Sequence, residues 1–471
     1  MSRNARGWTR PLALLALAAW LVGCASVNSD EAIGTARDWS QRVDADAPQL
    51  RLAERRGEEL RALRERLLAA PLTEGAALQL ALAHSAALQV LLAEGWSAQA
   101  AAAQRGAPPN PFFMFERVVT AGDVDITRFL GIGLTELLTW PWRRDIADRE
   151  IEVLRLQLAR EVLAFSAEVR AAWVRAVAAQ QLVAYHRQVQ DAAAAGAELA
   201  RRMQAVGNFS RLQRAREQAF LADATTQLAW AMSLATVERE ALVRKLGLDA
   251  DDAERLQLPE RLPDLPATAR QGDEVAQRAM NERLDLLLAR AQLGAAQRAL
   301  GLETVQLFDI ELAAVRELGP GGGRGRGFEA GVVLPLLDPG IALRQASSAR
   351  ALAAQNHFAQ VRIEAASVLR ERYVLYRSAH DLARHQRDEV VPLKRTITDE
   401  MLLNYNGMLV GVFELLADAR AQVGAVIAAI EAQRDFWLAD AALNAAIVGA
   451  PATSTPLATA NASATADRKG H

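Results

Sequence analysis

The sequence is poor in several residue types, and each shortage argues against a class of protein. A single cysteine among 471 residues has no partner for an intramolecular disulfide. The 54 basic and 56 acidic side chains nearly cancel, so net charge gives no reason to expect a nucleic-acid partner. Aromatic residues make up only 5% of the chain, which is dominated by Ala, Leu, Arg, Glu and Gln. This composition is typical of long packed helices.

Motifs for catalysis and metal binding are also lacking. The histidines include His380 and His385, which are not spaced to share one helical face, and there is no HExxH or Cys/His cluster. Met401 and Met408 flank a predicted helix turn, and thioethers suit Cu(I), but we interpret them as packing residues. The glycine-rich GPGGGRGRG stretch at 319–327 lacks a Lys-Ser or Lys-Thr pair, so we interpret it as an external loop. We therefore expect no enzyme, no cofactor and no bound metal.

Residues 1–23 have the features of an export signal. Three arginines precede an apolar run from Leu12 to Trp20, which is too short to span a bilayer as a mature helix. The run ends in LVGC, which resembles a bacterial lipobox. The resemblance implies that Cys24 carries acyl chains such as palmitate and begins an acylated segment, 24–71. Ala25, where some lipoproteins have aspartate, implies the outer membrane as destination.

The remainder of the chain repeats one pattern twice. We predict a first repeat at 72–258 and a second at 272–449, each with a helix, a β-hairpin and a long helix pair. A proline-punctuated linker at 259–271 joins them. The small, polar tail at 450–471 is expected to be disordered. The fold is thus predicted to be mainly α, internally duplicated, with four strands per chain.

Two turns interrupt the long helical stretches. Gly207 and Asn208 mark the first, and Asn404–Gly407 marks the second, where Asn and Gly tolerate positive φ. Arms of about 60 residues reach on the order of 90 to 100 Å. The apolar face of the second pair has helical spacing, with Leu402, Val412, Leu415, Leu416, Ala419, Val423, Val426, Ile427 and Ile430.

The predicted hairpins span 111–138 and 305–335. In the second, apolar residues from Phe308 to Leu312 alternate with acids, and strands of about ten residues match the length of a transmembrane β-strand. Four strands cannot close into a barrel, and an open edge cannot face lipid. Either the strands lie outside a membrane or several chains complete one barrel, and three chains would supply twelve strands.

The ordered set of motifs resembles the outer-membrane factor, or TolC-like, family over nearly all of the mature chain. The motifs are the lipobox, ERLDL at Glu282–Leu286, the prolines Pro141 and Pro335 that close the hairpins, and the turn sequences VGNFSRL and YNGMLVGVFELLADARAQ. The resemblance implies a homotrimer with a 12-stranded outer-membrane barrel and a long periplasmic α-helical barrel. It also implies a periplasmic adaptor protein and an inner-membrane pump as partners, with export of small molecules or ions from a Gram-negative cell.

The resemblance suggests roles for residues at the two turns. The adaptor-docking candidates, which on the alternative interpretation only shape the turns, are Gly207, Ser210, Leu212, Gly407 and Val410. Family members often have aspartates just after the second turn, where this chain has Phe413 and Leu416.

The nearby acids Glu414 and Asp418 are the candidate periplasmic gate. The alternative is that they are solvated charges favoured by the helix dipole. Arg387, Lys394 and Arg395 are their candidate ion-pair partners.

The acids of the second hairpin suggest an acidic lumen. If the apolar residues face lipid, Asp309, Glu311 and Glu329 face the lumen and favour cations weakly. The alternative function is a lipid-anchored periplasmic coiled-coil scaffold that inserts no strands in a membrane. A cell-envelope hydrolase has no residue set in its support.

Overall fold

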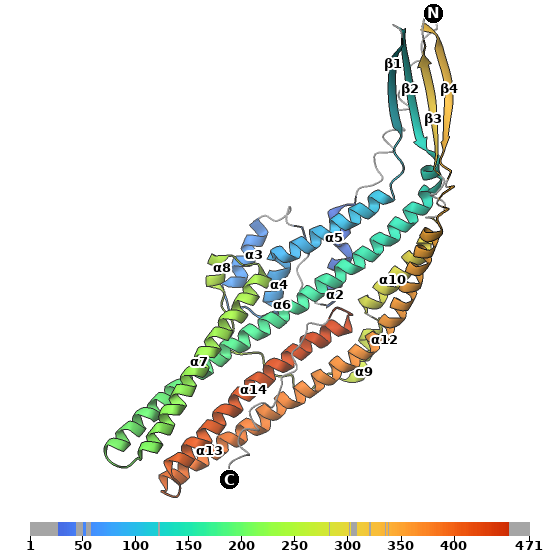
Figure 1. The fold of residues 1–471 in the computed structure, drawn as a ribbon. Coiled ribbons are helices and arrows are strands. Elements are labelled where there is room, and N and C mark those ends of the chain that lie inside the picture. Colours follow the sequence, from blue (N-terminus) through green and yellow to red (C-terminus); the bar gives the residue numbers. More distant parts are fainter. Residues whose placement is uncertain are drawn as a thin grey trace, which may run out of the picture. The chain divides into compact units, whose positions relative to one another are not determined.

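The computed structural model describes residues 27–451 except 44–49, 53–57, 121–122, 282, 301, 303–308, 320–321, 335 and 338. The predicted signal, Cys24 and nearly all of the predicted tail lie outside this part. The chain forms two compact units, each built from segments of both repeats. Figure 1 labels the elements named below. Unit 1 comprises described residues of Met1–Trp39, Val90–Ala159 and Leu284–Glu364. Unit 2 comprises those of Ser40–Gln89, Arg160–Arg283 and Ala365–His471.

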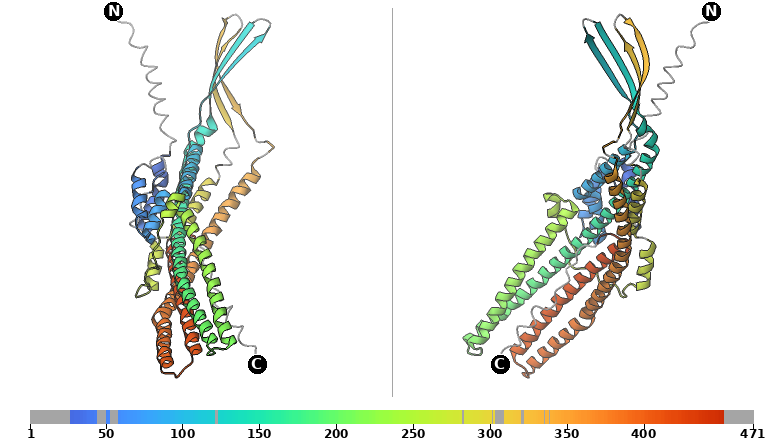
Figure 2. Two further views of the ribbon diagram at one scale, coloured as in Figure 1. Left: turned by 90° about the vertical axis from the view of Figure 1, so that its left-hand side faces the viewer. Right: turned by 45° about the vertical axis from the view of Figure 1, so that its right-hand side comes forward.

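Unit 1 contains a four-stranded antiparallel sheet in the order β1-β2-β3-β4. Its strands are β1 (Phe112–Thr120), β2 (Asp123–Gly133), β3 (Ile310–Leu318) and β4 (Arg324–Val332). The hairpins of the two repeats are joined because β2 pairs with β3. Figure 2 shows the four strands side by side in two further views. The prediction of four strands per chain is confirmed.

The first hairpin ends earlier than predicted. Residues 134–138 are helical, because α6 (Leu134–Ala205) begins directly after Gly133. Leu134 and Leu138 are four residues apart, a spacing that fits one helical face as well as one face of a strand. Pro141 consequently lies inside α6 instead of closing the hairpin.

The glycine-rich stretch 319–327 is not entirely a loop. Its second half forms the start of β4, where Arg324 pairs with Leu318 and Arg326 with Arg316. Alternating Gly and Arg made this segment look like a turn, since Gly is depleted in strands. Pairing with β3 overrides that local preference.

Within unit 1, α5 packs closely against α6 and is tied to α2. Its helical segments belong to α2 (Ser29–Val43), α5 (Ala86–Arg105), α6, α10 (Leu284–Ala299) and α12 (Ile341–His385). A Cβ on Gly95 would lie 2.9 Å from the Leu158 side chain, so α5 approaches α6 closely. The buried Gln99 amide donates to the Ala32 carbonyl over 3.0 Å and ties α2 to α5.

Unit 2 consists of helices and the linker between the repeats. Besides parts of α2, α5, α6 and α12, it contains α3 (Glu58–Leu68), α4 (Glu74–His84), α7 (Arg211–Leu246), α8 (Ala250–Arg255), α9 (Gly272–Asn281), η3 (Gln386–Val390), α13 (Val391–Asn406) and α14 (Val412–Ile447). Thr73 caps α4 by accepting a hydrogen bond from the Ala76 amide over 3.2 Å. The π-helix η3 ends two residues before Pro392, which has no amide hydrogen to continue the α-helical pattern.

The length and apolar content of the described helices bear on whether any of them could span a membrane. None is by itself long and apolar enough; α4 and α5 meet the length and composition criteria only when taken together, and they are bent by 51° where they meet.

Candidate functional site

The first helix tip joins α6 to α7 and is fixed by its own residues. Gly207 has φ of +84°, a left-handed conformation that favours glycine. Ser210 caps α7, since its hydroxyl accepts from the Gln213 amide over 3.2 Å while the Gln213 side chain accepts from the Ser210 amide over 2.7 Å. This reciprocal pair is a capping box. The predicted docking residue Leu212 is 62% exposed.

The second helix tip joins α13 to α14 with different backbone chemistry. Gly407, which could tolerate a positive φ, instead has φ of −78°. The left-handed residue is Met408, with φ of 56° and 93% exposure. Asn404 to Asn406 still belong to α13, so the turn begins later than the Asn-rich sequence indicated. Gly411 caps α14 without a side-chain hydrogen bond, and the predicted docking residue Val410 is half-buried.

The candidate gate acids lie on the first turns of α14. Glu414 is exposed and Asp418 is half-buried. Arg387 instead pairs with Asp388, and Arg395 lies 4.0 Å from Asp399. Within the described residues, neither gate acid has an ion-pair partner.

An ion pair near the tips links the two repeats, and the sequence analysis missed it. Arg420 of α14 contacts Glu217 of α7 at 2.8 Å. The Glu217 side chain is only 3% exposed, and the Arg420 guanidinium also lies 4.2 Å from the centroid of the Phe220 ring. A small apolar cluster of α6, α7 and α14 residues, which includes Ala224 and Val423, packs nearby. The pair thus fixes α14 against the first helix pair.

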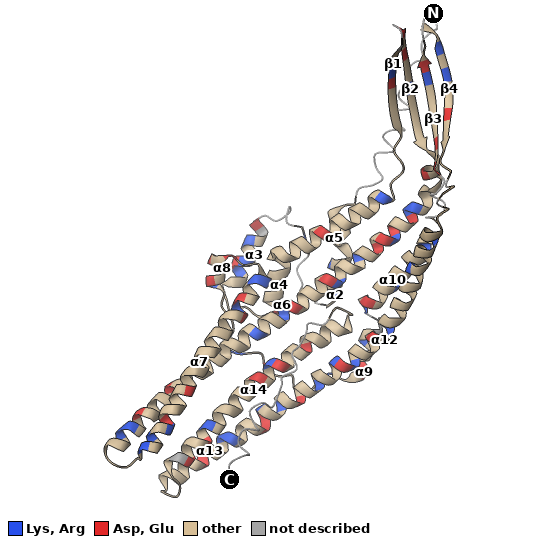
Figure 3. Ribbon diagram, viewed as in Figure 1, with Lys and Arg blue, Asp and Glu red and all other residues tan. Residues whose placement is uncertain are grey.

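The two faces of the sheet differ in charge. Successive residues of a strand point to opposite faces, and directly paired residues share a face. By this register Glu311 and Glu329, two of the acids predicted to face a lumen, lie on the same face of the sheet. Asp309 directly precedes β3, and its carbonyl accepts from the Val333 amide over 2.8 Å. Figure 3 shows where the charged residues of the strands lie.

Comparison with solved structures defines the fold. A membrane protein from Pseudomonas aeruginosa aligns with a TM-score of 0.67 and 19% identity, over 83% of this chain and 94% of its own. The outer membrane protein VceC of Vibrio cholerae aligns with a TM-score of 0.67 and 17% identity, over 83% and 96%. The CmeC outer membrane channel of Campylobacter jejuni gives 0.65 and 13%, over 89% of each chain. No protein-family model and no curated protein matches the sequence.

The chain has the outer-membrane factor, or TolC-like, fold. The expected combination of long helix pairs and a four-stranded sheet is therefore confirmed.

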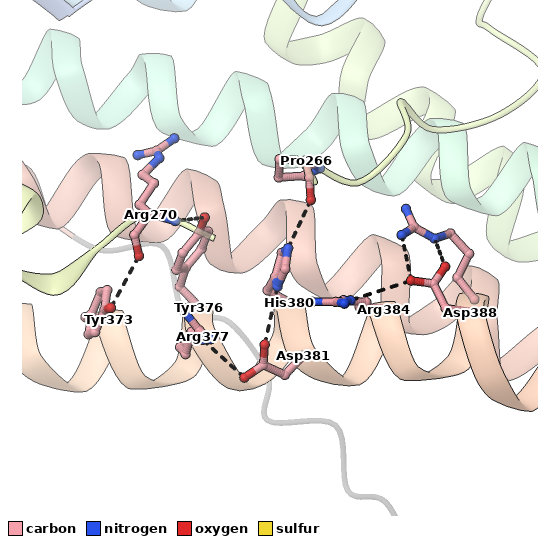
Figure 4. Close-up of polar contacts among 10 residues, drawn as sticks. Pro266, Arg270, Tyr373, Tyr376, Arg377, His380, Asp381, Arg384 and Asp388 are labelled. Carbon is pink, nitrogen blue, oxygen red and sulfur yellow. Dashed lines mark hydrogen bonds and ion pairs between the residues drawn. The ribbon is translucent and has the colours of Figure 1, made fainter. Parts of the chain in front are cut away.

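The linker between the repeats is held by α12, as Figure 4 shows, and by α14. The Arg270 amide donates to the Tyr376 hydroxyl over 3.2 Å, and the Tyr373 hydroxyl donates to the Arg270 carbonyl over 3.3 Å. The buried His380 ring lies 3.1 Å from the Pro266 carbonyl oxygen. The Trp437 indole donates to the Pro263 carbonyl over 3.0 Å. The linker is thus an integral part of unit 2.

Arg270 also forms the polar centre of this joint. Its guanidinium contacts Asp440 at 2.9 Å and donates to Asn444 over 2.6 Å. Burial raises the pKa of the Asp440 carboxyl, and the charge of Arg270 opposes that shift. These contacts join residues that are 170 or more positions apart in the sequence, so helical periodicity could not predict them.

Proposed function

We propose that copies of this chain form an outer-membrane channel, the exit duct of a tripartite efflux or secretion system. The observation that carries the proposal is the open sheet, in which β1 and β4 are edge strands. In lipid, the backbone groups of an open edge would lack hydrogen-bond partners, so the sheet must close against other strands. Three copies supply twelve strands, a size suited to an open pore. Small molecules or ions then pass through the pore without being chemically changed.

The helix tips are the proposed docking sites for a periplasmic adaptor protein, which connects the duct to an inner-membrane pump. Both turns lie at the same end of unit 2 (Figures 1 and 2), and both expose apolar side chains. Leu212 is 62% exposed at the first tip, and Leu409 is 77% exposed at the second. Gly207, Ser210, Gly407 and Val410 shape the turns that present these side chains. Exposed apolar groups of this kind suit a protein interface.

The proposed anchor is an acylated Cys24 in the outer membrane, supported by the basic start, the short apolar run and the LVGC sequence before it. The test is native mass spectrometry of full-length protein from a host that processes lipoproteins. A trimer whose subunits begin at an acylated Cys24 supports the anchor and the shared barrel. An acylated monomer keeps the anchor, removes the means of closing the sheet and favours the coiled-coil scaffold. A Cys24→Ala variant provides the unacylated mass control.

Glu414 and Asp418 are the proposed gate. Acids at the narrow end of a trimeric duct would bring three copies of each side chain together and attract cations to a closed entrance. Replacing both residues by alanine is expected to raise the single-channel conductance in planar bilayers. The matched control is Asp399→Ala with Glu400→Ala, which removes two acids from the neighbouring helix α13. Unchanged conductance in the gate variant would remove Glu414 and Asp418 from the gate.

A further inference from the structure

The charged residues of the sheet are sorted by sign between its faces. In the paired registers every strand arginine falls on one face, which we call the arginine face, and every strand acid falls on the other, the acidic face. The arginines are Arg117, Arg128, Arg316, Arg324 and Arg326. The acids are Glu116, Asp123, Asp125, Glu311, Glu317 and Glu329. The sheet therefore presents two surfaces of opposite charge.

The arginines gather in two adjacent rows near the hairpin turns. Arg128, Arg316 and Arg326 stand directly opposite one another on three neighbouring strands. Arg117 and Arg324 flank the next row toward the turns. All five side chains are exposed, and within the described part of the chain none of them has an ion-pair or hydrogen-bond partner. Figure 3 shows the basic residues of the strands toward the turns.

Like charges placed directly opposite each other destabilise a sheet. The acidic face cannot relieve this repulsion, because its carboxylates point the other way. An anion from outside the chain would relieve this repulsion.

The rest of the arginine face is apolar. The rows on the side away from the turns contain Phe113 at 65%, Leu130 at 60% and Phe328 at 81% exposure. Leu334 and Leu336, which follow the end of β4, are also exposed. One continuous surface thus combines a broad apolar band with a cationic border.

We propose that this border, the arginine belt (Arg117, Arg128, Arg316, Arg324 and Arg326), binds the phosphate groups of outer-leaflet lipids. The inference rests on the proposed function, an outer-membrane barrel, and adds that the hairpin turns face the exterior and the apolar band faces lipid. Guanidinium groups bind phosphate through paired, charge-assisted hydrogen bonds.

A phosphorylated lipid fits both parts of the surface, because its acyl chains cover the apolar band while its headgroup meets the arginines. An acidic protein or a nucleic acid would neutralise the charges but leave the band uncovered. In a barrel closed by copies of the chain, β4 of one copy lies beside β1 of the next, so the belts join into a ring.

The experiment is a lipid titration of full-length protein in detergent, read by native mass spectrometry. The probes are bisphosphorylated lipid A and, as a zwitterionic lipid, phosphatidylethanolamine. The test variant is Arg128→Gln, Arg316→Gln and Arg326→Gln combined. The control is Glu116→Gln with Glu317→Gln, which changes charge at the same level of the sheet on the acidic face. Oligomeric state and bilayer conductance are recorded for every protein.

We expect the wild type and the acidic-face control to bind lipid A more tightly than phosphatidylethanolamine. The triple variant should weaken lipid A binding by roughly tenfold or more, as loss of three cationic contacts to an anionic headgroup implies. Lysine at the same three positions should restore part of the affinity, since charge returns without the guanidinium fork. If the triple variant does not assemble, Arg326→Gln alone on the edge strand β4 should weaken binding by about threefold.

Several results would overturn the inference. They are equal binding of both lipids by the wild type, unchanged lipid A binding in the folded triple variant, and complete displacement of lipid A by inorganic phosphate. Soluble heparin binding as tightly as lipid A would indicate a general polyanion surface instead. Wild type that binds lipid A selectively but gives no conductance would contradict the channel function and not the belt.

Discussion

The two helix tips both reverse the direction of the chain between two long helices, but they use different residues to do so. The first uses Gly207 for its left-handed position and the Ser210 capping box to satisfy the start of α7. The second places Met408 in the left-handed region and starts α14 at Gly411 with no side-chain cap. A non-glycine residue in this region costs about 1 to 2 kcal/mol. The second tip is therefore intrinsically less stable, and strain of this kind is often found where a structure must change.

The comparison implies that the second tip opens first. Its stability depends on contacts with the first helix pair more than on its own turn. The pair between Arg420 and the buried Glu217 is such a contact. The following predictions, from the largest effect to the smallest, test this difference. Hydrogen exchange read by mass spectrometry gives the opening free energy of each tip separately.

Arg420→Ala should have the largest effect. It leaves the buried Glu217 carboxylate without its cation, which costs about 3 kcal/mol or more. Exchange should increase in α14 and in the part of α7 around Glu217. Arg395→Ala, which removes an exposed pair with Asp399, is the control and should change the opening free energy by less than about 0.5 kcal/mol. Equal effects of the two variants would contradict the proposed link between the tips.

Substituting the residue with positive φ in each tip should change the stability of the two tips in opposite directions. Gly207→Ala should destabilise the first tip by about 1 kcal/mol, because alanine is strained at this φ although the space for its Cβ is open. Met408→Gly should stabilise the second tip by roughly 0.5 kcal/mol, since relief of strain exceeds the added flexibility of glycine. A stabilising Gly207→Ala or a destabilising Met408→Gly would show that the backbone angles do not explain the difference.

Substituting the N-cap residues of α7 and α14 should reduce the difference in stability between the two tips. Ser210→Ala should cost the first tip about 1 kcal/mol through loss of the capping box. Gly411→Ser should stabilise the start of α14 by a few tenths of a kcal/mol, about the difference between glycine and serine caps. Ser210→Thr is the control that retains a capping hydroxyl. No change in the exchange of α7 on Ser210→Ala would exclude the cap as a source of stability.

Among these predictions, acidification should have the smallest effect on stability. Hydrogen bonds from Arg201 and Arg202 lower the pKa of the exposed Glu198 carboxyl near the first tip from 4.5 to about 2. A lowered folded-state pKa stabilises the fold above the unfolded value, and this contribution is lost as pH falls from 4.5 toward 2. Glu198→Gln should therefore melt at a slightly lower temperature than wild type at neutral pH and converge with it near pH 2. If the difference in melting temperature between Glu198→Gln and wild type stays constant across this pH range, the lowered pKa of Glu198 is contradicted.

The sequence predicted the order of elements well because periodicity reports burial directly. Alternating residues located the strands, and the Thr73 cap was recognised from local chemistry. Local sequence patterns gave wrong predictions where one pattern fits two kinds of secondary structure. Leu134 and Leu138 fit a strand face and a helix face alike, and the glycines beside Arg324 and Arg326 suggested a loop.

Contacts between distant residues could not be predicted in the same way. Glu217 and Arg420 are 203 positions apart, and Arg270 contacts Asn444 across 174. Each of these residues lies in a polar local sequence that is equally typical of a solvated helix surface. The positive φ of Met408 likewise depends on how α13 ends, whereas the sequence pointed only to the Asn and Gly residues of 404–407 as tolerant of positive φ.

Single-channel recording in planar bilayers tests the central claim most directly. Purified full-length protein and its Glu414→Ala, Asp418→Ala variant should insert and produce discrete conductance steps, larger in the variant and selective for cations. Folded, bilayer-inserted protein that gives no steps in either form would contradict the account of this chain as an outer-membrane duct.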